Sequence, residues 1–315
     1  MFAKYEYVYA VYTEKSFTRA AQKLFISQPS LSAAVKNIEK KVGAPLFERT
    51  GTGVSPTEIG MEYINAAEKM MSIENDFNNR INDIYNLETG EITVGGTNYL
   101  CSYVLPKIIN KFASMYPKIK VTLVEANSQN LCNMIDNEEI DILVDSYDEN
   151  MDMYEGSPLL SERVMLCVPY HWDINSRFKE NAVNPEQIYN GDLNLYNLAP
   201  IPVCAFSKEP FILLKKGNDM YNRAISVFEK NNIVPNVVFS VDQLNISYAL
   251  AESGMGACFI TDTLFKFSKF GNSVVLYNLS EEHCTRTLYI AHKKGKYCGG
   301  AMKKFIETAK EVVKN

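Results

Sequence analysis

The chain has 315 residues, and 32 Lys and Arg against 37 Asp and Glu give it a formal net charge of −5. This length accommodates about two domains or slightly more, each with a sizeable core. No apolar stretch is long enough to cross a bilayer, and the first residues lack the apolar core of a signal peptide, which predicts a cytoplasmic protein without a membrane partner. The seven cysteines are scattered without a CxxC pair, so reduced thiols are expected.

The first sixty residues predict three helices joined by tight turns. The first helix has apolar positions at the spacing of one face: Tyr5, Val8, Tyr9 and Tyr12. Thr18 is the expected N-cap of the second helix, whose apolar side is Ala20, Ala21, Leu24 and Phe25. Ser27 then caps the third helix, and Pro29 suits its first turn because no hydrogen bond is lost there. Gly43 and Pro45 end this helix.

The third helix has two different faces. One face is apolar: Leu31, Val35, Ile38 and Val42. The other face is small and polar, as a helix needs in order to enter the DNA major groove. Gln28 suits an adenine edge, and Ser30 and Ser32 suit bases or phosphates. Lys36 and Lys40 suit phosphates. The alternative is a helical subdomain whose polar face meets only water.

A short β-wing is predicted after the third helix. Arg49 begins a segment with Gly51-Thr52-Gly53, which could turn beside the minor groove. Residues 1–60 hold eight basic and five acidic side chains, so their net charge is +3. Because the whole chain has a net charge of −5, the remaining residues have a net charge of −8. A modestly basic head on an acidic body suits a protein that presents one end to DNA. Because three net charges are few, two or more heads are expected to bind together.

The run from Tyr5 to Gly60 resembles the winged helix-turn-helix of LysR-type transcriptional regulators. The matching motifs are Ser16-Phe17-Thr18-x-Ala20-Ala21, Ser27-Gln28-Pro29-Ser30-Leu31-Ser32, Ile38-Glu39, Gly43-x-x-Leu46-Phe47-x-Arg49 and Val54-x-x-Thr57-x-x-Gly60. Two positions depart from the family pattern, because Ala33 and Thr52 stand where a longer polar or basic residue is usual. Both departures remove donors, so base preference or affinity is expected to differ. The DNA-binding candidates are Thr18, Ser27, Gln28, Pro29, Ser30, Ser32, Ala33, Lys36, Lys40, Arg49 and Thr52.

A long linker helix is predicted at 59–89, after a DNA-binding domain at 1–58. Its apolar positions step alternately by four and three residues, which is the spacing of a coiled-coil seam. These candidate dimerisation residues are Ile59, Tyr63, Ala66, Met70, Ile73, Phe77 and Ile81. The alternative is a helix packed on its own domain. The family resemblance favours dimerisation, which would place two recognition helices on neighbouring half-sites.

From residue 90 strands and helices alternate, which predicts an α/β domain with mostly parallel strands. The family resemblance continues here in Leu105-Pro106, Phe112, Tyr116-Pro117, Asp141-Ile142 and Ala251-Glu252-Ser253-Gly254-Met255-Gly256. It implies an α/β multidomain fold: an all-α winged helix-turn-helix, a linker helix, and a periplasmic-binding-protein-like effector domain at 90–315. That domain would have two subdomains crossed twice by the chain. Subdomain I would span about 90–162 and 267–315, and subdomain II about 163–266.

Ligands of such folds bind beyond the carboxyl ends of strands, at helix N-termini. Polar residues follow the first two strands of the domain, and a strand expected at Val203–Phe206 would place the opposite wall after it. The effector-binding candidates are Thr97, Asn98, Tyr99, Asn127, Ser128, Gln129, Ser207, Phe211, Gln243 and Thr261. Each could instead be a plain helix cap or turn residue. Few basic residues occur in these loops, so a strongly anionic ligand would depend on helix dipoles.

No catalytic residue, metal site or cofactor is expected. His171, His283 and His292 lie far apart and belong to no catalytic motif. Asp141 and Asp145 would share a strand face, but without a helper motif solvation or capping of a strand end is the expected role. A thiol switch would need two close, exposed cysteines, and only Cys284 and Cys298 lie in segments expected to be exposed.

These observations predict a DNA-binding transcriptional regulator that responds to a small-molecule effector bound between two subdomains. The alternative is a ligand-independent or thiol-redox-responsive DNA-binding regulator. The expected partners are double-stranded promoter or operator DNA, the effector and further copies of the chain, while RNA polymerase is left open as one more. The family resemblance implies a homotetramer built as a dimer of dimers. Effector identity, target genes and the choice between activation and repression do not follow from the sequence.

Overall fold

The computed structural model describes residues 4–50, 53–84, 89–146, 153–280 and 284–314. The chain forms two compact units, one of residues up to Ile81 and one of nearly all the remaining residues. No helix in the described ranges is both long and apolar enough to cross a membrane.

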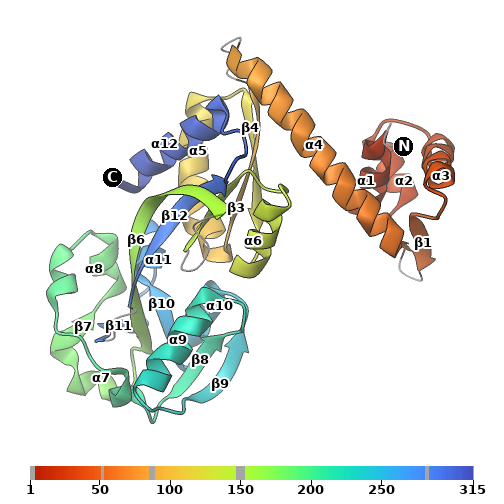
Figure 1. Ribbon diagram of the computed structural model, residues 1–315. Helices are drawn as coiled ribbons and strands as arrows, with labels where there is room; N and C mark the ends of the chain where they lie inside the picture. The colour runs from red at the N-terminus through yellow and green to blue at the C-terminus, as the bar shows by residue number, and fades with distance from the viewer. Residues whose placement is uncertain (1–3, 51–52, 85–88, 147–152, 281–283, 315) are drawn as a thin grey trace. The chain divides into compact units, whose positions relative to one another are not determined.

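The first unit is a helical domain with a two-stranded wing (Figure 1). Its elements are α1 (Tyr5–Glu14), α2 (Phe17–Lys23), α3 (Gln28–Val42), β1 (Phe47–Thr50), β2 (Gly53–Pro56) and α4 (Glu58–Ile84). β1 and β2 pair antiparallel, as the predicted wing requires. One core contains Leu31 and Val35 of α3, Val8 of α1 and Ile64 of α4, all of them buried. The first turns of α4 are therefore part of this domain.

Two details of the helix-turn-helix differ from the sequence-based expectation. The N-cap of α2 is Ser16, whose hydroxyl accepts a hydrogen bond from the Arg19 amide, so Thr18 lies inside the helix. The helix ends at Lys23, and Phe25 has a φ of 54° and is 95% exposed. Phe25 therefore does not continue the apolar side of α2, because the chain turns before it. The predicted caps of α3 are confirmed, since Ser27 accepts from the Ser30 amide and Gly43 ends the helix with a φ of 87°.

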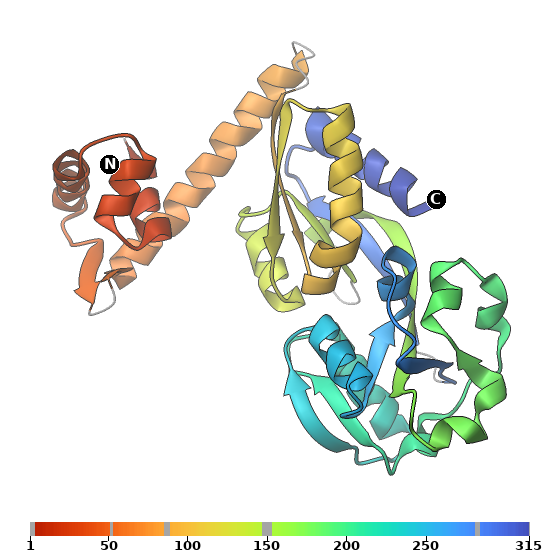
Figure 2. The same cartoon turned by 180° about the vertical axis from the view of Figure 1, so that it is seen from behind.

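The second unit begins with an α/β subdomain. Its strands are β3 (Gly90–Gly96), β4 (Ile119–Glu125), β5 (Ile142–Ser146), β12 (Thr285–Lys293) and the first part of β6 (Tyr154–Pro169). The order is β4-β3-β5-β12-β6, with β4, β3 and β5 parallel. The helical turn η1 (Leu100–Val104), α5 (Leu105–Met115) and α12 (Gly300–Lys314) pack on one face, where Phe112 meets Phe305. α6 (Ser128–Asp136) covers the other face through a separate core that includes Leu131 (Figure 2).

The second subdomain is built around the last part of β6. This part pairs with β10 (Ala257–Thr261) and β11 (Val274–Asn278), and β10 continues into parallel β8 (Pro210–Leu214) and β9 (Asn236–Val241). Two-residue β7 (Ala182–Val183) pairs with β11. The helices are α7 (Ile174–Arg177), α8 (Pro185–Tyr189), α9 (Asp219–Lys230), α10 (Leu244–Glu252) and α11 (Asp262–Phe267). Short 3-10 turns are η3 (Lys179–Asn181), η4 (Leu193–Asn197) and η5 (Val203–Phe206).

The chain crosses twice between the two subdomains, as expected. The first crossing is continuous, because β6 pairs with β12 up to Arg163 and with β10 from Val164. The return lies later than residue 267, because β11 still pairs with the second part of β6 and only β12, from Thr285, rejoins the first sheet. The boundary expected at 267 is therefore wrong by one strand. The strand expected at Val203–Phe206 is also wrong, since those residues form η5.

Candidate functional site

The polar face of α3 is exposed as a continuous surface. Gln28, Pro29, Ser30, Ala33, Lys36 and Lys40 are exposed, and Ser32 is half-buried. Ser27 and Thr18 are exposed at the turn and on α2. The Ser27 and Ser30 hydroxyls lie 2.7 Å apart and bond each other, so both help to hold the first turn of α3. The Gln28 side chain is then held at the exposed N-terminal end of a fixed helix, which is where a recognition helix contacts base edges.

The wing places Arg49 in β1, opposite Val54 of β2. The turn between these strands contains Thr52, which lies outside the described residues. The other departure from the family pattern, Ala33, is exposed on α3 in the middle of the candidate DNA surface. An alanine there offers a methyl group and no hydrogen-bond donor.

The apolar seam on α4 changes character along the helix. Tyr63 is buried in the N-terminal core and Ala66 is half-buried. Ile59 and Met70 are exposed, Ile73 is 68% and Phe77 is 61% exposed, and Ile81 is half-buried. Large exposed apolar side chains at regular spacing are unusual on a helix that faces only water. The distal half of α4 is therefore a candidate contact surface, and residues 85–88 of the predicted linker lie outside the described ranges.

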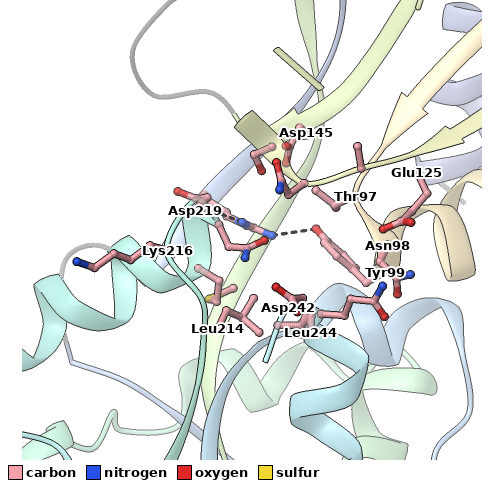
Figure 3. Close-up of a pocket in the computed structure, with 17 residues that line it drawn as sticks. Thr97, Asn98, Tyr99, Glu125, Asp145, Leu214, Lys216, Asp219, Asp242 and Leu244 are labelled. Carbon is pink, nitrogen blue, oxygen red and sulfur yellow. Dashed lines mark hydrogen bonds and ion pairs between the residues drawn. The ribbon is translucent and has the colours of Figure 1, made fainter. Parts of the chain in front are cut away.

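A cavity of about 260 Å³ lies between the two subdomains of the second unit (Figure 3). The parallel strands β3, β4 and β5 end at one edge of their sheet, and the residues that follow them reach the cavity from one side. Residues after β8 and β9 reach it from the other side. This is the position where ligands bind open α/β sheets. Six of the candidate effector residues line it: Thr97, Asn98, Tyr99, Asn127, Ser128 and Gln243.

Two of these residues hold buried polar atoms without a hydrogen-bond partner. They are the hydroxyl oxygen of Thr97 and the side-chain oxygen of Asn98. A buried polar atom without a partner costs about 1–3 kcal/mol, so most such atoms in folded proteins are satisfied. Both residues directly follow β3 and both face the same cavity. Each of these two cavity-lining side chains therefore leaves one oxygen unsatisfied in the folded protein.

Arg286 anchors the floor of the cavity through a buried network. Its Nε lies 2.7 Å from Glu162 Oε2, its register partner across β12 and β6. Nη1 lies 2.6 Å from Asp219 Oδ2, and Nη2 donates to the Tyr99 hydroxyl at 2.9 Å. Tyr99 in turn donates to Glu162 at 2.8 Å. The network therefore joins the first subdomain, the crossing strands and the first residue of α9 in the second subdomain.

The pKa values of the network follow from burial and charge. Burial alone would lower the pKa of Arg286, but Tyr99, Glu162 and Asp219 raise it well above its ordinary value. Burial alone would raise the pKa of Asp219, but Arg286 and Arg223 lower it. The Tyr99 pKa is raised well above its ordinary range, chiefly by burial. At neutral pH Arg286 and Asp219 are thus ionised, and Tyr99 is a neutral phenol.

Asp145, at the end of β5, is the remaining buried acid of the cavity. It is 4% exposed, and its Oδ1 accepts from the Ser146 amide at 2.8 Å. Burial raises its pKa to about 6, while hydrogen bonds from Ser128 and Ser146 and the charge of Arg286 act in the opposite direction. Asp145 belongs to no ion pair among the residues that the structure describes. The expectation of a solvated strand-end residue is therefore wrong, whereas the hydrogen bond to the Ser146 amide agrees with the capping role that was also expected.

Four candidate effector residues do not line this cavity. Phe211 lies inside β8 and is fully buried against Phe228, with ring centroids 4.9 Å apart. Ser207 is exposed after η5, and it misses the cavity because the strand expected before it is absent. Gln129 is exposed on α6. Thr261 is fully buried at the end of β10, before α11.

Sequence-based reasoning missed the charged residues of the cavity. Asp145 occurs in β5, which is otherwise mostly apolar, and Arg286 occurs at a buried position of β12. An ionisable residue at a buried strand position is itself a signal of a paired or functional group. Asp219 and Asp242 could have been found only from the tertiary structure, since each stands at a helix or strand end that looks solvated in sequence.

The remaining titratable candidates have separate, structural roles. Asp141 accepts from the Thr93 amide at 2.7 Å and pairs with Lys296 at 3.0 Å, away from the cavity-lining residues. Cys284 is buried, contrary to expectation, Cys298 is half-buried, and Cys204 is exposed. His283 lies outside the described residues. Within the described ranges no group of three His, Cys, Asp or Glu residues is placed to hold a metal ion.

Comparison with protein families matches both units. Residues 2–61 match the model of the bacterial regulatory helix-turn-helix protein, lysR family, and residues 86–314 match the LysR substrate binding domain. The HTH-type transcriptional regulator YcgK of Bacillus subtilis (strain 168), described as uncharacterized, is 26% identical over 313 residues, which cover 98% of this chain and 94% of that protein.

Solved structures show the same fold at low identity. The crystal structure of CbnR, a LysR family transcriptional regulator, has a TM-score of 0.66 and 14% identity over 100% of both chains. Full-length CbnR complexed with its target DNA has a TM-score of 0.67 and 15% identity over 99% of both chains.

Proposed function

Because this chain belongs to the LysR family of DNA-binding transcriptional regulators, we propose that a small molecule bound in its cavity controls its binding to operator DNA. The observation that carries the proposal is the pair of unpartnered acceptors of Thr97 and Asn98, buried in a cavity to which both subdomains contribute. A bound molecule would satisfy atoms that the folded protein leaves without partners.

The DNA contact is assigned to the exposed face of α3. Gln28 is the candidate for base recognition, since an amide side chain pairs with adenine through two hydrogen bonds. Lys36 and Lys40 are exposed further along the helix and suit phosphates. The methyl group of Ala33 leaves the middle of the surface to apolar contact. The head would therefore draw its specificity from the N-terminal end of α3.

Pairing of chains is assigned to the distal half of α4. The exposed Ile73 and Phe77 are four residues apart, as on one face of a helix, and would be covered by the same helix of a second copy. The two heads of such a dimer would bind neighbouring half-sites. Two dimers on one operator would form the tetramer that the family resemblance implies.

The ligand would act through the contacts between the two subdomains. The Ser146 hydroxyl donates to Asp219 at 3.2 Å, and Arg286 binds the same carboxylate, so the wall of the cavity is also the junction of the subdomains. A ligand that favours one arrangement of the subdomains would shift the population of that arrangement. Such coupling is commonly worth about 1–3 kcal/mol, which is a roughly 5- to 150-fold change in DNA affinity.

The test uses the full chain and DNA from upstream of its own gene. We expect steep salt dependence and a preference of at least about a thousandfold over unrelated DNA. A low-molecular-weight extract of the source cells should change this affinity for the wild type but not for Thr97→Ala or Ser128→Ala. The control is Ser114→Ala, which removes an exposed serine of α5 whose hydroxyl bonds only its own helix. Full response in both cavity variants would contradict the proposed site.

A further inference from the structure

The charges around the cavity restrict the chemistry of its ligand. Arg286, which lines the cavity, and Arg223, which lies behind Asp219, are already matched by acids, since Arg286 pairs with Glu162 and Asp219, and Arg223 lies 2.8 Å from Asp219. All three nitrogens of Arg286 donate to protein atoms. These two cations and two anions sum to zero. A ligand carboxylate would therefore have to displace Glu162, Asp219 or Tyr99 in order to reach Arg286.

Lysines do not supply the missing positive charge. Lys215 pairs with Asp242 at 2.8 Å, at a site where both side chains are largely exposed. Lys216 lines the cavity, but its side chain is exposed and extends away from Tyr99 and Thr97 in Figure 3. The acids that remain unmatched at the cavity are Asp145, which is buried, and Glu125, which is exposed at its edge. Among the described residues that line the cavity, four carboxylates therefore stand against two cations, Lys216 and Arg286.

The acceptors that remain free also favour a donor. The Asp145 carboxylate accepts hydrogen bonds from the Ser146 amide and the Ser128 hydroxyl. Because the two oxygens of a carboxylate offer about four acceptor positions, some of these positions remain free. Thr97 and Asn98 contribute unpartnered oxygens in the same cavity. An ammonium group has three donors and no acceptor, so it matches this set in both charge and hydrogen bonding.

The opposite side of the cavity holds apolar side chains next to polar ones such as Asp242 and Gln243. Leu214 and Leu244 lie on the other side of the Tyr99 hydroxyl from Asp145 and Thr97 in Figure 3, and Met220 contributes to the lining. A molecule with a charged end and an apolar body would thus meet a matching wall at each end. A cavity of about 260 Å³ limits that molecule to a small metabolite.

We propose that the cavity binds a small primary amine, with its ammonium group paired to Asp145 and hydrogen-bonded toward Thr97 and Asn98, and its apolar body against Leu214 and Leu244. This inference rests on the proposed function, since it names the ligand class of the same site. The ammonium supplies the counter-charge that the buried Asp145 lacks. Burying an unpaired charge is costly, and a charge-assisted hydrogen bond offsets that cost.

The test compares compounds that share a skeleton and differ in one group. Benzylamine, benzyl alcohol and benzoate form one set, and cyclohexylamine, cyclohexanol and cyclohexanecarboxylate form a second. Binding to the full chain is read from the methyl NMR signals of Leu214 and Met220, both of which line the cavity. We expect the amines to bind at least about tenfold more tightly than the alcohols, as for one charge-assisted hydrogen bond, and the acids to bind most weakly.

The variant Asp145→Asn should lose the preference for amines over alcohols and keep the affinity for alcohols. The matched control is Asp173→Asn, an exposed aspartate of the second subdomain that does not line the cavity. It should keep the preference. Amines that bind no more tightly than alcohols or acids, or a preference that survives in Asp145→Asn, would overturn the amine assignment alone. If no compound of any class moves the Leu214 or Met220 signals, the proposed effector site fails as well.

Discussion

The guanidinium of Arg286 lies 2.6 Å from the carboxylate of Asp219, and this contact joins the strand that returns to the first subdomain to the first residue of α9 in the second. The same guanidinium is bonded to Glu162 on the neighbouring strand, which is 1% exposed. One side chain thus holds the crossing strands together and connects the two walls of the cavity. Its removal would leave the Glu162 carboxylate buried without a counter-charge.

Arg286→Met should therefore destabilise the second unit strongly. Breaking a buried pair from one side costs about 3–5 kcal/mol, because a buried charge is left unpaired. Urea unfolding followed by the fluorescence of Trp172, the single tryptophan, would measure the loss. Lys215→Met is the control, since its exposed pair with Asp242 should change stability by less than about 1 kcal/mol. Adding Glu162→Gln to Arg286→Met should restore part of the loss, and no recovery would argue against an unpaired charge as the cause.

Asp145 predicts a particular pH dependence of stability. Burial raises its pKa from 3.8 to about 6 in the folded state, so between these values the folded protein holds the proton more tightly than the unfolded chain. Stability is therefore lost as pH rises through this window. Four charged or titratable groups interact electrostatically with Asp145. They are Arg286 from β12, Asp219 from α9, Tyr99 at the start of η1 and Cys132 of α6. All four keep one protonation state there, because the raised pKa values of Tyr99, Cys132 and Arg286 and the lowered pKa of Asp219 lie outside it.

Asp145→Asn should thus be more stable than the wild type at pH 7.5, by roughly 1–3 kcal/mol. The difference should shrink by about 1 kcal/mol at pH 5, since the wild-type carboxyl is then mostly protonated. Thermal unfolding at several pH values would measure it, with Asp173→Asn as the exposed control. A difference that is independent of pH would show that the variant acts by packing.

Gln28 and Lys36 should affect DNA binding in different ways. Gln28→Ala should weaken binding to the upstream fragment by about 1–3 kcal/mol and leave binding to unrelated DNA nearly unchanged. Lys36→Ala should weaken both and reduce the slope of log affinity against log salt by about 1. Salt titrations on the two DNAs separate these outcomes, and Gln129→Ala, on α6 of the second unit, is the control. Equal losses on both DNAs for Gln28→Ala would make it a backbone contact.

A single glutamate in the distal half of α4 should disrupt the pairing of two chains. Ile73→Glu or Phe77→Glu would place a charge where a second copy of α4 is expected to pack, and burying an unpaired charge is costly. We expect the chain to dissociate to smaller species in light scattering at micromolar concentration. Asn78→Glu adds the same charge at a neighbouring exposed position and should leave the mass unchanged. An unchanged mass for both apolar variants would move the interface elsewhere.

Local patterns were sufficient to predict most elements of this chain. Ser27, Pro29 and Gly43 bound α3 as expected, because capping and proline geometry depend on neighbours in sequence. The end of α2 was not predictable in the same way. Leu24 and Phe25 continue its apolar spacing, yet the chain turns at Phe25 so that α3 can pack on α1 and α2. Tertiary packing there overrides a local pattern.

The helix-turn-helix head, the long helix and one wall of the cavity could all be predicted from local patterns. Thr97 directly follows β3, and Ser128 begins the helix shortly after β4. The parallel order of these strands places their ends together, so proximity in sequence to a strand end is enough to find both residues. The charge of the cavity, in contrast, depends on contacts between segments that are distant in the chain. Asp219 lies 74 residues after Asp145 in the chain, and Arg286 lies 67 residues after Asp219. They meet because the chain crosses twice between two sheets. Pairing of charges across that crossing produces no periodic pattern in the sequence, so it cannot be predicted from residue spacing.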